Sequence, residues 1–287
     1  MSSTDFPPCD RRDFLKGAAA GLILVPRPAL RTVGSHLIPR KTTVAIVRTG
    51  DRKEGVRRVM ALLDLPDIAG KAVNLKPNFN TADPSPASTH VDTLAQIVSE
   101  LKARDAREVV VGESSFPPTA EVMEAKGVES EHNVSTCCLK THAYGGVFTM
   151  SLKLAVGLTP KSIRRGMHRS PHMRRMIAEL NQGYTPRLII MDGVEAFTDG
   201  GPSSGRLARA NVMIGGTDRV AVDAVGLAVL NDLAANTAIM ETPIFQQEQM
   251  ARAVDVGLGI QGPQDIAFVR DDEAGTAYAA RLREILD

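Results

Sequence analysis

Short apolar runs alternate along the chain with stretches in which apolar residues recur every three or four positions. The first pattern is typical of buried strands and the second of amphipathic helices, so their alternation predicts strands joined by helical crossovers. We expect strands at 43–48, 71–76, 108–111, 134–139, 187–191, 212–215 and 266–269, and helices at 53–64, 90–103, 119–126, 218–230, 245–256 and 273–285.

This order of elements predicts an α/β fold with a mostly parallel sheet and helices on both faces, in a Rossmann-like three-layer arrangement. Residues 43–287 contain no repeat and no long linker, so we expect a single domain there, with residues 143–183 as a small basic lobe. The chain has 287 residues and is 43% hydrophobic. It can therefore bury one substantial core, which excludes a disordered chain and a disulfide-stapled miniprotein.

The first thirty residues differ from the rest. Arg11-Arg12 lies shortly before an apolar run, 17–25, that Pro26 ends. This pattern looks like a twin-arginine export leader, and the run is too short to span a bilayer, which needs about 20 residues. The alternative is the basic start of a cytosolic helix. We expect residues 1–30 to engage the twin-arginine translocase and residues 31–42 to connect this leader to the folded domain. The protein is then expected to be periplasmic or extracytoplasmic, with no stable membrane span once the leader is cleaved.

The net charge and the cysteine content argue against some classes of function. Thirty-four Lys and Arg balance thirty-three Asp and Glu, only 4% of residues are aromatic and Trp is absent. These values argue against nucleic acid as a partner. Beyond the leader, Cys137 and Cys138 are adjacent, which does not match the spacing of a four-thiolate iron–sulfur or zinc site. Their simplest interpretation is burial in a strand.

Polar residues follow four of the predicted strands. The carboxyl ends of parallel strands meet at one edge of an open sheet, where ligands bind, so these residues are expected to converge there. The alternative is that each is a solvated loop residue with its own local partner. The residues are Lys76, Asn78, Glu113, Lys140, His142 and Asp192.

The chemistry of these side chains favours an anion site. Lys76, Lys140 and Lys153 would supply point charges for a carboxylate or phosphate. His142, with an ordinary pKa near 6.5, is the candidate proton shuttle. Asp192 is a candidate metal ligand or lysine partner, but its simplest role is that of the turn residue before Gly193.

Residues 161–175 contain six Lys or Arg, two His and no acid. Arg164, Arg165 and His168 are therefore candidates for an anion clamp or mobile lid, and the alternative is a solvated helix. Ser170-Pro171 predicts the start of a helix, so His168 and His172 are not expected to share a helix face.

Two glycine-rich segments and two aspartates also have candidate roles. Residues 200–205 form a flexible turn that would let backbone amides approach a ligand. Residues 257–262 have dinucleotide-binding spacing, but they follow a helix rather than a strand, so that interpretation is rejected. Asp218 is a candidate helix cap, and Asp223, inside an apolar helix, would need a partner if buried.

Several short motifs lie in order over about residues 43–262, at 73–78, 139–142, 151–153, 191–193 with 201–202, and 216–223. Together they resemble Domain of Unknown Function family 362. The resemblance implies an α/β domain, frequent twin-arginine export and, in some relatives, an appended ferredoxin-like module whose cysteines are absent here. Two departures are Leu154, where the family usually has Asn, and a short stretch at 128–135, which predicts an incomplete version of the fold.

The leading hypothesis is an exported protein that binds a small anionic ligand at the strand ends, with acid–base catalysis by His142 and Lys140. The alternative is an accessory protein in extracytoplasmic redox, iron–sulfur or metal handling. The residues that matter more in that case are Cys137, Cys138, His142, His168 and Asp192. The sequence identifies neither a substrate nor a cofactor, and it does not decide whether the protein is an enzyme.

Overall fold

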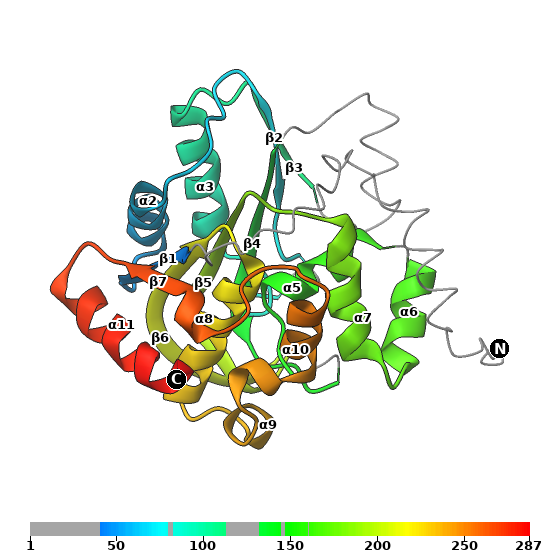
Figure 1. The fold of residues 1–287 in the computed structure, drawn as a ribbon. Coiled ribbons are helices and arrows are strands. Elements are labelled where there is room, and N and C mark those ends of the chain that lie inside the picture. The colour runs from blue at the N-terminus through cyan, green and yellow to red at the C-terminus, as the bar shows by residue number, and fades with distance from the viewer. Residues whose placement is uncertain (1–40, 80–82, 113–131, 145–146, 160) are drawn as a thin grey trace, which may run out of the picture.

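The computed structural model describes residues 41–79, 83–112, 132–144, 147–159 and 161–287 (Figure 1). The expected leader, almost all of the connector, the predicted helix 119–126 and the candidate Glu113 lie outside these ranges. No helix in the described part of the chain is both long and apolar enough to cross a membrane.

Seven strands form one open sheet in the order β3-β2-β4-β5-β6-β1-β7. Strand β6 pairs antiparallel with both neighbours, and every other pair is parallel. The predicted α/β fold with a mostly parallel sheet is therefore confirmed. The strands are β1 (Thr42–Arg48), β2 (Ala72–Lys76), β3 (Glu108–Val111), β4 (His132–Lys140), β5 (Leu188–Gly200), β6 (Gly205–Gly216) and β7 (Ile266–Val269).

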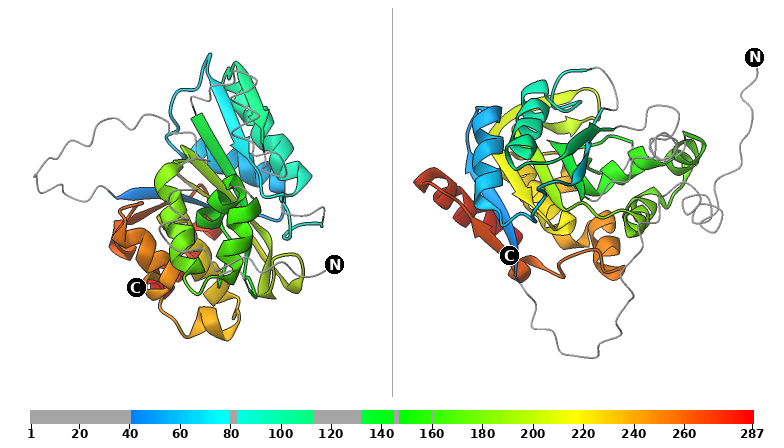
Figure 2. Two further views of the ribbon diagram at one scale, coloured as in Figure 1. Left: turned by 90° about the vertical axis from the view of Figure 1, so that its right-hand side faces the viewer. Right: turned by 90° about the horizontal axis from the view of Figure 1, so that it is seen from above.

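Helices cover both faces of the sheet. Helices α2 (Arg52–Leu62) and α3 (Val91–Ala103) lie side by side and bury Val56, Val59 and Ile97 against one face (Figures 1 and 2). The opposite face packs against α8 (Arg219–Asp232), α10 (Glu248–Asp255) and α11 (Glu273–Leu286). The sheet is thus the middle of three layers, and each face has its own apolar cluster.

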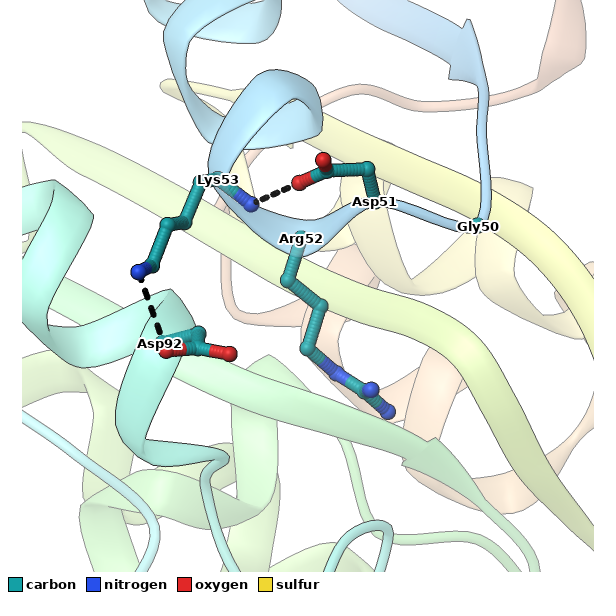
Figure 3. Close-up of a pocket in the computed structure, with 5 residues that line it drawn as sticks. All are labelled: Gly50, Asp51, Arg52, Lys53 and Asp92. Atoms are coloured by element: carbon teal, nitrogen blue, oxygen red, sulfur yellow. Dashed lines mark hydrogen bonds and ion pairs between the residues drawn. The ribbon is translucent and has the colours of Figure 1, made fainter.

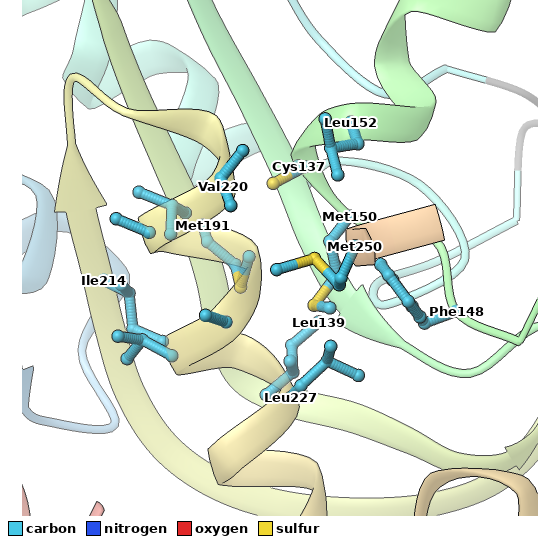
Figure 4. Close-up of a cluster of buried hydrophobic side chains, with 14 of the residues drawn as sticks. Cys137, Leu139, Phe148, Met150, Leu152, Met191, Ile214, Val220, Leu227 and Met250 are labelled. Carbon is cyan, nitrogen blue, oxygen red and sulfur yellow. The ribbon is translucent and has the colours of Figure 1, made fainter. Parts of the chain in front are cut away.

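Helix α8 lies at the centre of the larger cluster. It begins after Asp218, whose carboxylate accepts hydrogen bonds from the backbone N–H groups of Val220 and Ala221, as predicted for a cap. Every residue from Arg219 to Leu230 is buried, as expected for a helix that is apolar on all sides. Figure 4 shows Val220 and Leu227 of this helix among side chains from β4, β5 and β6.

Residues 151–159 and 161–183, most of the expected basic lobe, are largely helical and lie beside the sheet (Figure 1). Met167 and Met176 join the same apolar cluster as α8, so this segment shares the main core. Helices α6 and α7 pack against each other, and α7 also contacts α10 (Figure 1). The segment comprises α5 (Ser151–Leu154), α6 (Lys161–Arg169), α7 (Met173–Leu180) and 3-10 turns at Ala155–Leu158 and Asn181–Gly183, and α9 (Thr237–Met240) and turns at Ile244–Gln246 and Pro263–Asp265 follow later.

Strand β5 corrects one prediction. We expected the strand to stop at a turn formed by Asp192 and Gly193, but it continues to Gly200 and forms a long hairpin with β6. The pairing register shifts between Gly193 and Glu195, so the glycine lies at an irregularity within the strand. A β-carbon at Gly193 would contact Val212 on the neighbouring strand, which explains the requirement for glycine there.

Candidate functional site

Strand β4 carries Lys140 to the carboxyl edge of the sheet and buries it completely. The Lys140 Nζ donates hydrogen bonds to the carbonyl oxygens of Ala87, at 2.5 Å, and Pro202, at 3.2 Å. Burial lowers the pKa of this lysine. None of the described carboxylates forms an ion pair with it. Lys140 is thus a buried amine held by two carbonyl dipoles.

The turn between β5 and β6 supplies one of these carbonyl groups. Gly201 has a φ of +82°, and a β-carbon there would overlap the carbonyl oxygen of Thr141. The Thr141 hydroxyl also donates to the carbonyl oxygen of Gly200, at 3.1 Å. In the structure, Gly201 therefore allows this turn to pack closely against the chain's own backbone at Thr141. It brings Pro202 within reach of Lys140.

His142 lies just beyond the end of β4 and is only 5% exposed. Its ring centroid is 4.8 Å from that of Tyr144 and 6.5 Å from that of His168, two rings that are exposed to solvent. Burial and then the positive charges of Lys153, His168 and Lys140 lower the pKa of His142 to about 2. The imidazole is therefore neutral at pH 7, with one nitrogen as donor and the other as acceptor.

Lys153 lies on α5, a helix of four residues that is clamped from two sides. The Asp223 carboxylate accepts hydrogen bonds from the backbone N–H groups of Ser151, at 2.8 Å, and Leu152, at 3.0 Å. The Asn181 side chain donates to the carbonyl oxygen of Leu152 at 2.7 Å. The partner expected for a buried Asp223 is thus the start of α5. The clamp fixes the backbone from which the Lys153 amine projects.

Burial and the charge of Lys140 hold the pKa of Lys153 well below its ordinary range. Lys153 is itself the strongest charged influence on both His142 and His168. These four residues form the lysine–histidine cluster: Lys140, His142, Lys153 and His168.

Helix α6 contributes part of the predicted basic segment. Arg164 and His168 are one turn apart on α6, and the charge of Arg164 helps to lower the pKa of His168, after burial and Lys153. Arg165 is exposed on the same helix. His172 precedes the first residue of α7, so it shares no helix with His168, as the sequence predicted.

The other strand-end candidates are buried at different points along the sheet. Lys76 is level with Ser135 in the β2–β4 register, five residues before Lys140, which corresponds to ~17 Å along the strand. Its Nζ donates to the carbonyl oxygen of Pro77. The Asn78 amide donates to the carbonyl oxygen of Ala87, the same acceptor that Lys140 uses. The backbone around Ala87 therefore links Asn78 to the cluster.

Asp192 belongs to a separate, buried ion network. Its carboxylate accepts hydrogen bonds from Arg52 Nε at 2.9 Å and from the Thr93 hydroxyl at 2.6 Å. The same guanidinium donates to Glu195, also at 2.9 Å. Sequence analysis missed Arg52, although it follows β1 and the strand-end argument applies there too. Asp192 is thus already neutralised by the protein's own arginine.

A surface cavity of about 480 Å³ lies beside this network, where α2 and α3 begin (Figure 3). The side chain of Lys53 forms an ion pair with Asp92 across it, at 3.4 Å. The Asp51 carboxylate caps α2 by accepting from the backbone N–H groups of Lys53 and Glu54. The charged groups that line the cavity therefore have partners in the protein, and those of Arg52 are Asp192 and Glu195.

The two cysteines lie on opposite faces of the sheet. Cys137 pairs with Met191 and packs into the apolar cluster around α8 (Figure 4), whereas Cys138 pairs with Asp192 and accepts a hydrogen bond from Asn78. Burial raises the pKa of both thiols, that of Cys138 to about 11. Adjacent strand residues point in opposite directions, so these thiols do not converge on one ion.

In the described ranges, no three His, Cys, Asp or Glu side chains come together as a metal site would require. The role in metal or redox handling stays a prediction.

Residues 257–262 have a structural role, in agreement with the rejection of a dinucleotide motif. The backbone N–H of Ile260 donates to the Asp218 carboxylate at 2.8 Å. A β-carbon at Gly259 would overlap that same carboxylate, so the glycine permits the segment to approach α8.

Comparison with known proteins identifies a family. No curated protein and no solved structure matches the chain. A family model described as a domain of unknown function, DUF362, matches residues 73–133 and 128–228. The two matched pieces meet where the sequence was expected to be short beside the family. Together they cover more than half of the chain, which therefore belongs to the DUF362 family.

Proposed function

We propose that this chain is exported through the twin-arginine pathway and binds a small anionic ligand, a carboxylate or phosphate, at the lysine–histidine cluster. The observation that carries this proposal is Lys140, a completely buried amine whose hydrogen-bond acceptors are two neutral carbonyl groups. A buried ammonium is costly unless a negative charge offsets it. A bound anion would supply that charge.

The surroundings of Lys140 support the same conclusion. Among the described residues, the charged groups named as shifting the pKa of His142, His168 and Lys153 are all cations. A bound carboxylate or phosphate would reverse these effects and raise all four pKa values. Binding is therefore coupled to proton uptake by the cluster, which would place His142 closer to the range in which it transfers protons.

The proposal is tested by measuring the melting temperature of the purified protein in increasing sulfate, phosphate or pyruvate. A ligand that binds only the folded state stabilises that state, and the stabilisation increases with the ratio of the ligand concentration to Kd. Lys140→Met is expected to lose this stabilisation, because Met keeps the length of the side chain and removes the charge. Lys102→Met, at an exposed lysine on α3, is the matched control and should behave as the wild type.

His168→Gln provides a second variant at an exposed position, in case Lys140→Met folds poorly. It should weaken the anion response while leaving the melting temperature in anion-free buffer nearly unchanged. Equal stabilisation of the wild type, Lys140→Met and His168→Gln by each anion would contradict the proposed site.

Export is tested independently by replacing Arg11 and Arg12 with Lys. Twin-arginine export depends on this pair, so the double variant should accumulate in the cytoplasm while the wild type reaches the extracytoplasmic fraction. Equal distribution of the two proteins would contradict the proposed leader.

A further inference from the structure

We propose that the exposed face of helices α6 and α7 binds the surface of an anionic lipid bilayer. Residues 132–178, which include most of both helices, contain eight Lys and Arg but neither Asp nor Glu. Outside residues 161–175, the chain from residue 41 onward has 22 Lys and Arg against 30 Asp and Glu. Positive charge is therefore concentrated on one segment, whereas the rest of the chain beyond residue 40 carries a negative excess.

Helices α6 and α7, with the turn between them, form the basic hairpin. The two helices pack against each other on the side of the molecule away from α11 (Figures 1 and 2). Arg165 and Arg169 are exposed one turn apart on α6, so they share a helix face. Arg174 and Arg175 are exposed in the first turn of α7, which begins three residues after α6 ends. The exposed arginines of the two helices thus adjoin at the turn.

These arginines have little counter-charge within the protein. In the described part of the chain, the side chains of Arg165, Arg169 and Arg175 form no hydrogen bond or ion pair. Arg174 lies 3.8 Å from Glu248 of α10, but both side chains are exposed, and such a pair is weak. The charge of the basic hairpin is therefore available to a partner outside the chain.

The apolar side of the basic hairpin is already used in the core. Met167, Met173 and Met176 are at most 5% exposed and belong to the apolar cluster around α8. An amphipathic helix that inserts into a bilayer needs an exposed apolar face, and these side chains do not provide one. The contact that the basic hairpin can make is therefore with lipid headgroups, through charge, and it is reversible.

A bilayer fits this surface better than another macromolecule. Protein partners are typically held by aromatic and apolar anchors in well-packed pockets, whereas the methionines of this hairpin face inward. The net charge of +1 and the low aromatic content argue against nucleic acid. A layer of anionic headgroups requires only positive charge, and the negative excess of the rest of the chain would turn the other faces away from it.

Tyr144 adds a second observation beside the basic hairpin. Its ring is 67% exposed, and its centroid is 6.1 Å from that of His168 on α6. Tyrosine is enriched at the level of lipid headgroups, because its ring is apolar and its hydroxyl group is polar. Tyr144 is therefore placed to enter the same headgroup layer as the arginines.

The test is sedimentation of the purified full chain with vesicles of equal parts phosphatidylglycerol and phosphatidylcholine. Binding should be absent with pure phosphatidylcholine and lost in about 1 M NaCl, where the Debye length is about 3 Å. Replacing Arg165, Arg169 and Arg175 with Gln should weaken binding about 100-fold, because each basic residue at an anionic membrane contributes a factor of about five.

The matched control replaces three exposed cations elsewhere with Gln, so that the net charge changes equally. It should bind the vesicles as the wild type does. The leader is the same in all three proteins, so the difference between the two triple variants isolates the basic hairpin. The control positions are Arg57, Lys102 and Arg107.

A fluorescence measurement locates the contact. Since the chain has no Trp, Tyr144→Trp introduces a single fluorophore beside the basic hairpin. Its emission should shift to shorter wavelength when vesicles with phosphatidylglycerol are added, and should stay unchanged with pure phosphatidylcholine. Sedimentation with the vesicles without a shift in emission would place the contact on another face and overturn the proposal.

Three further results would overturn it. One is equal binding of the two triple variants, and another is binding to pure phosphatidylcholine that persists in salt. The third is binding to poly-L-glutamate but not to the vesicles, which would identify an acidic protein as the partner. The melting temperature in sulfate is a separate measurement, so a negative vesicle result leaves the proposed anion site standing.

Discussion

The carboxylate of Asp223 accepts a hydrogen bond from the backbone N–H of Ser151 at 2.8 Å, across 72 residues of sequence. A second bond, from Leu152, occupies the other carboxylate oxygen. One fully buried acid on α8 thus satisfies the first two N–H groups of α5, which has no cap of its own. This contact couples the central helix of the core to the backbone that carries Lys153.

Replacing Asp223 with Ala should lower the free energy of unfolding by about 3 kcal/mol, because two buried N–H groups lose a charged acceptor. Asp223→Asn keeps one acceptor oxygen and should cost less. Denaturant unfolding of the three proteins at pH 7 measures the difference. An alanine variant as stable as the wild type would show that the clamp contributes little.

The same residue predicts a pH dependence. Burial raises the pKa of Asp223 from its ordinary 3.8 to about 6. Between about pH 4 and pH 6, the folded protein therefore keeps the Asp223 carboxyl group protonated, whereas in the unfolded chain this group has already lost its proton. The free energy of unfolding is expected to fall as the pH rises from about 4 to about 6, by up to about 3 kcal/mol.

Asp223→Asn lacks this titration and is the control for all other groups. Unfolding of both proteins by urea at several pH values isolates the contribution of Asp223. Parallel pH profiles for wild type and variant would contradict the raised pKa.

Stabilisation by sulfate should strengthen as the pH is lowered from about 9 to about 6. The pKa values of Lys140 and Lys153 are lowered in the folded protein, so a falling pH restores the ammonium forms that attract the anion. Sulfate itself stays doubly charged over this range. The shift in melting temperature at fixed sulfate measures the effect, and Lys140→Met should flatten the profile.

Arg52→Met should be the most damaging of the charge substitutions near α2. It leaves the completely buried Asp192 without its cation, and breaking a buried pair in this way costs about 3–5 kcal/mol. Lys53→Met, at the adjacent exposed pair with Asp92, should change stability by less than about 1 kcal/mol.

The double variant Arg52→Met with Asp192→Asn should recover part of the loss, because it removes the unpaired charge as well. Denaturant unfolding of the wild type, Arg52→Met, Asp192→Asn and the double variant forms a cycle that isolates the contribution of the pair. Similar losses of stability for Arg52→Met and Lys53→Met would show that the buried network contributes no more to stability than the exposed pair.

Gly201→Ala should be more destabilising than Gly70→Ala, although both glycines have a positive φ. The positive φ alone costs about 1–2 kcal/mol for an L-residue. A β-carbon at Gly70 has no atom within 4 Å, whereas at Gly201 it would overlap the Thr141 carbonyl oxygen. Gly201→Ala must therefore shift the turn, move Pro202 away from Lys140 and weaken the anion response. Equal melting temperatures for the two variants would contradict this.

The fold was predictable because each strand contains a short apolar run. Strand β6 begins at Gly205 rather than at the expected 212, because residues 205–211 are not an apolar run. Strand β5 also runs past its expected end, since Asp192-Gly193 has the composition of a turn. Only the pairing with β6, which the sequence does not display, carries the strand on to Gly200.

The site was predictable only in part. Lys140 and His142 follow from the rule that ligands bind at strand ends, but strands of unequal length separate Lys76 from them along the sheet. Lys153 and His168 reach the cluster through the packing of α5 and α6. That packing depends on contacts such as the one between Asp223 and Ser151, which are distant in sequence and have no local signal.

The two carbonyl groups that hold Lys140 have a consequence for synthesis of the chain. One lies 53 residues earlier in the sequence and the other 62 residues later. A nascent chain therefore cannot assemble this arrangement until the β5–β6 hairpin has left the ribosome, and contacts of such sequence separation form late and slowly. A product truncated before Pro202 would lack one of the two acceptors, so capture of an anion by Lys140 would report that β4, the backbone at Ala87 and the β5–β6 turn have come together.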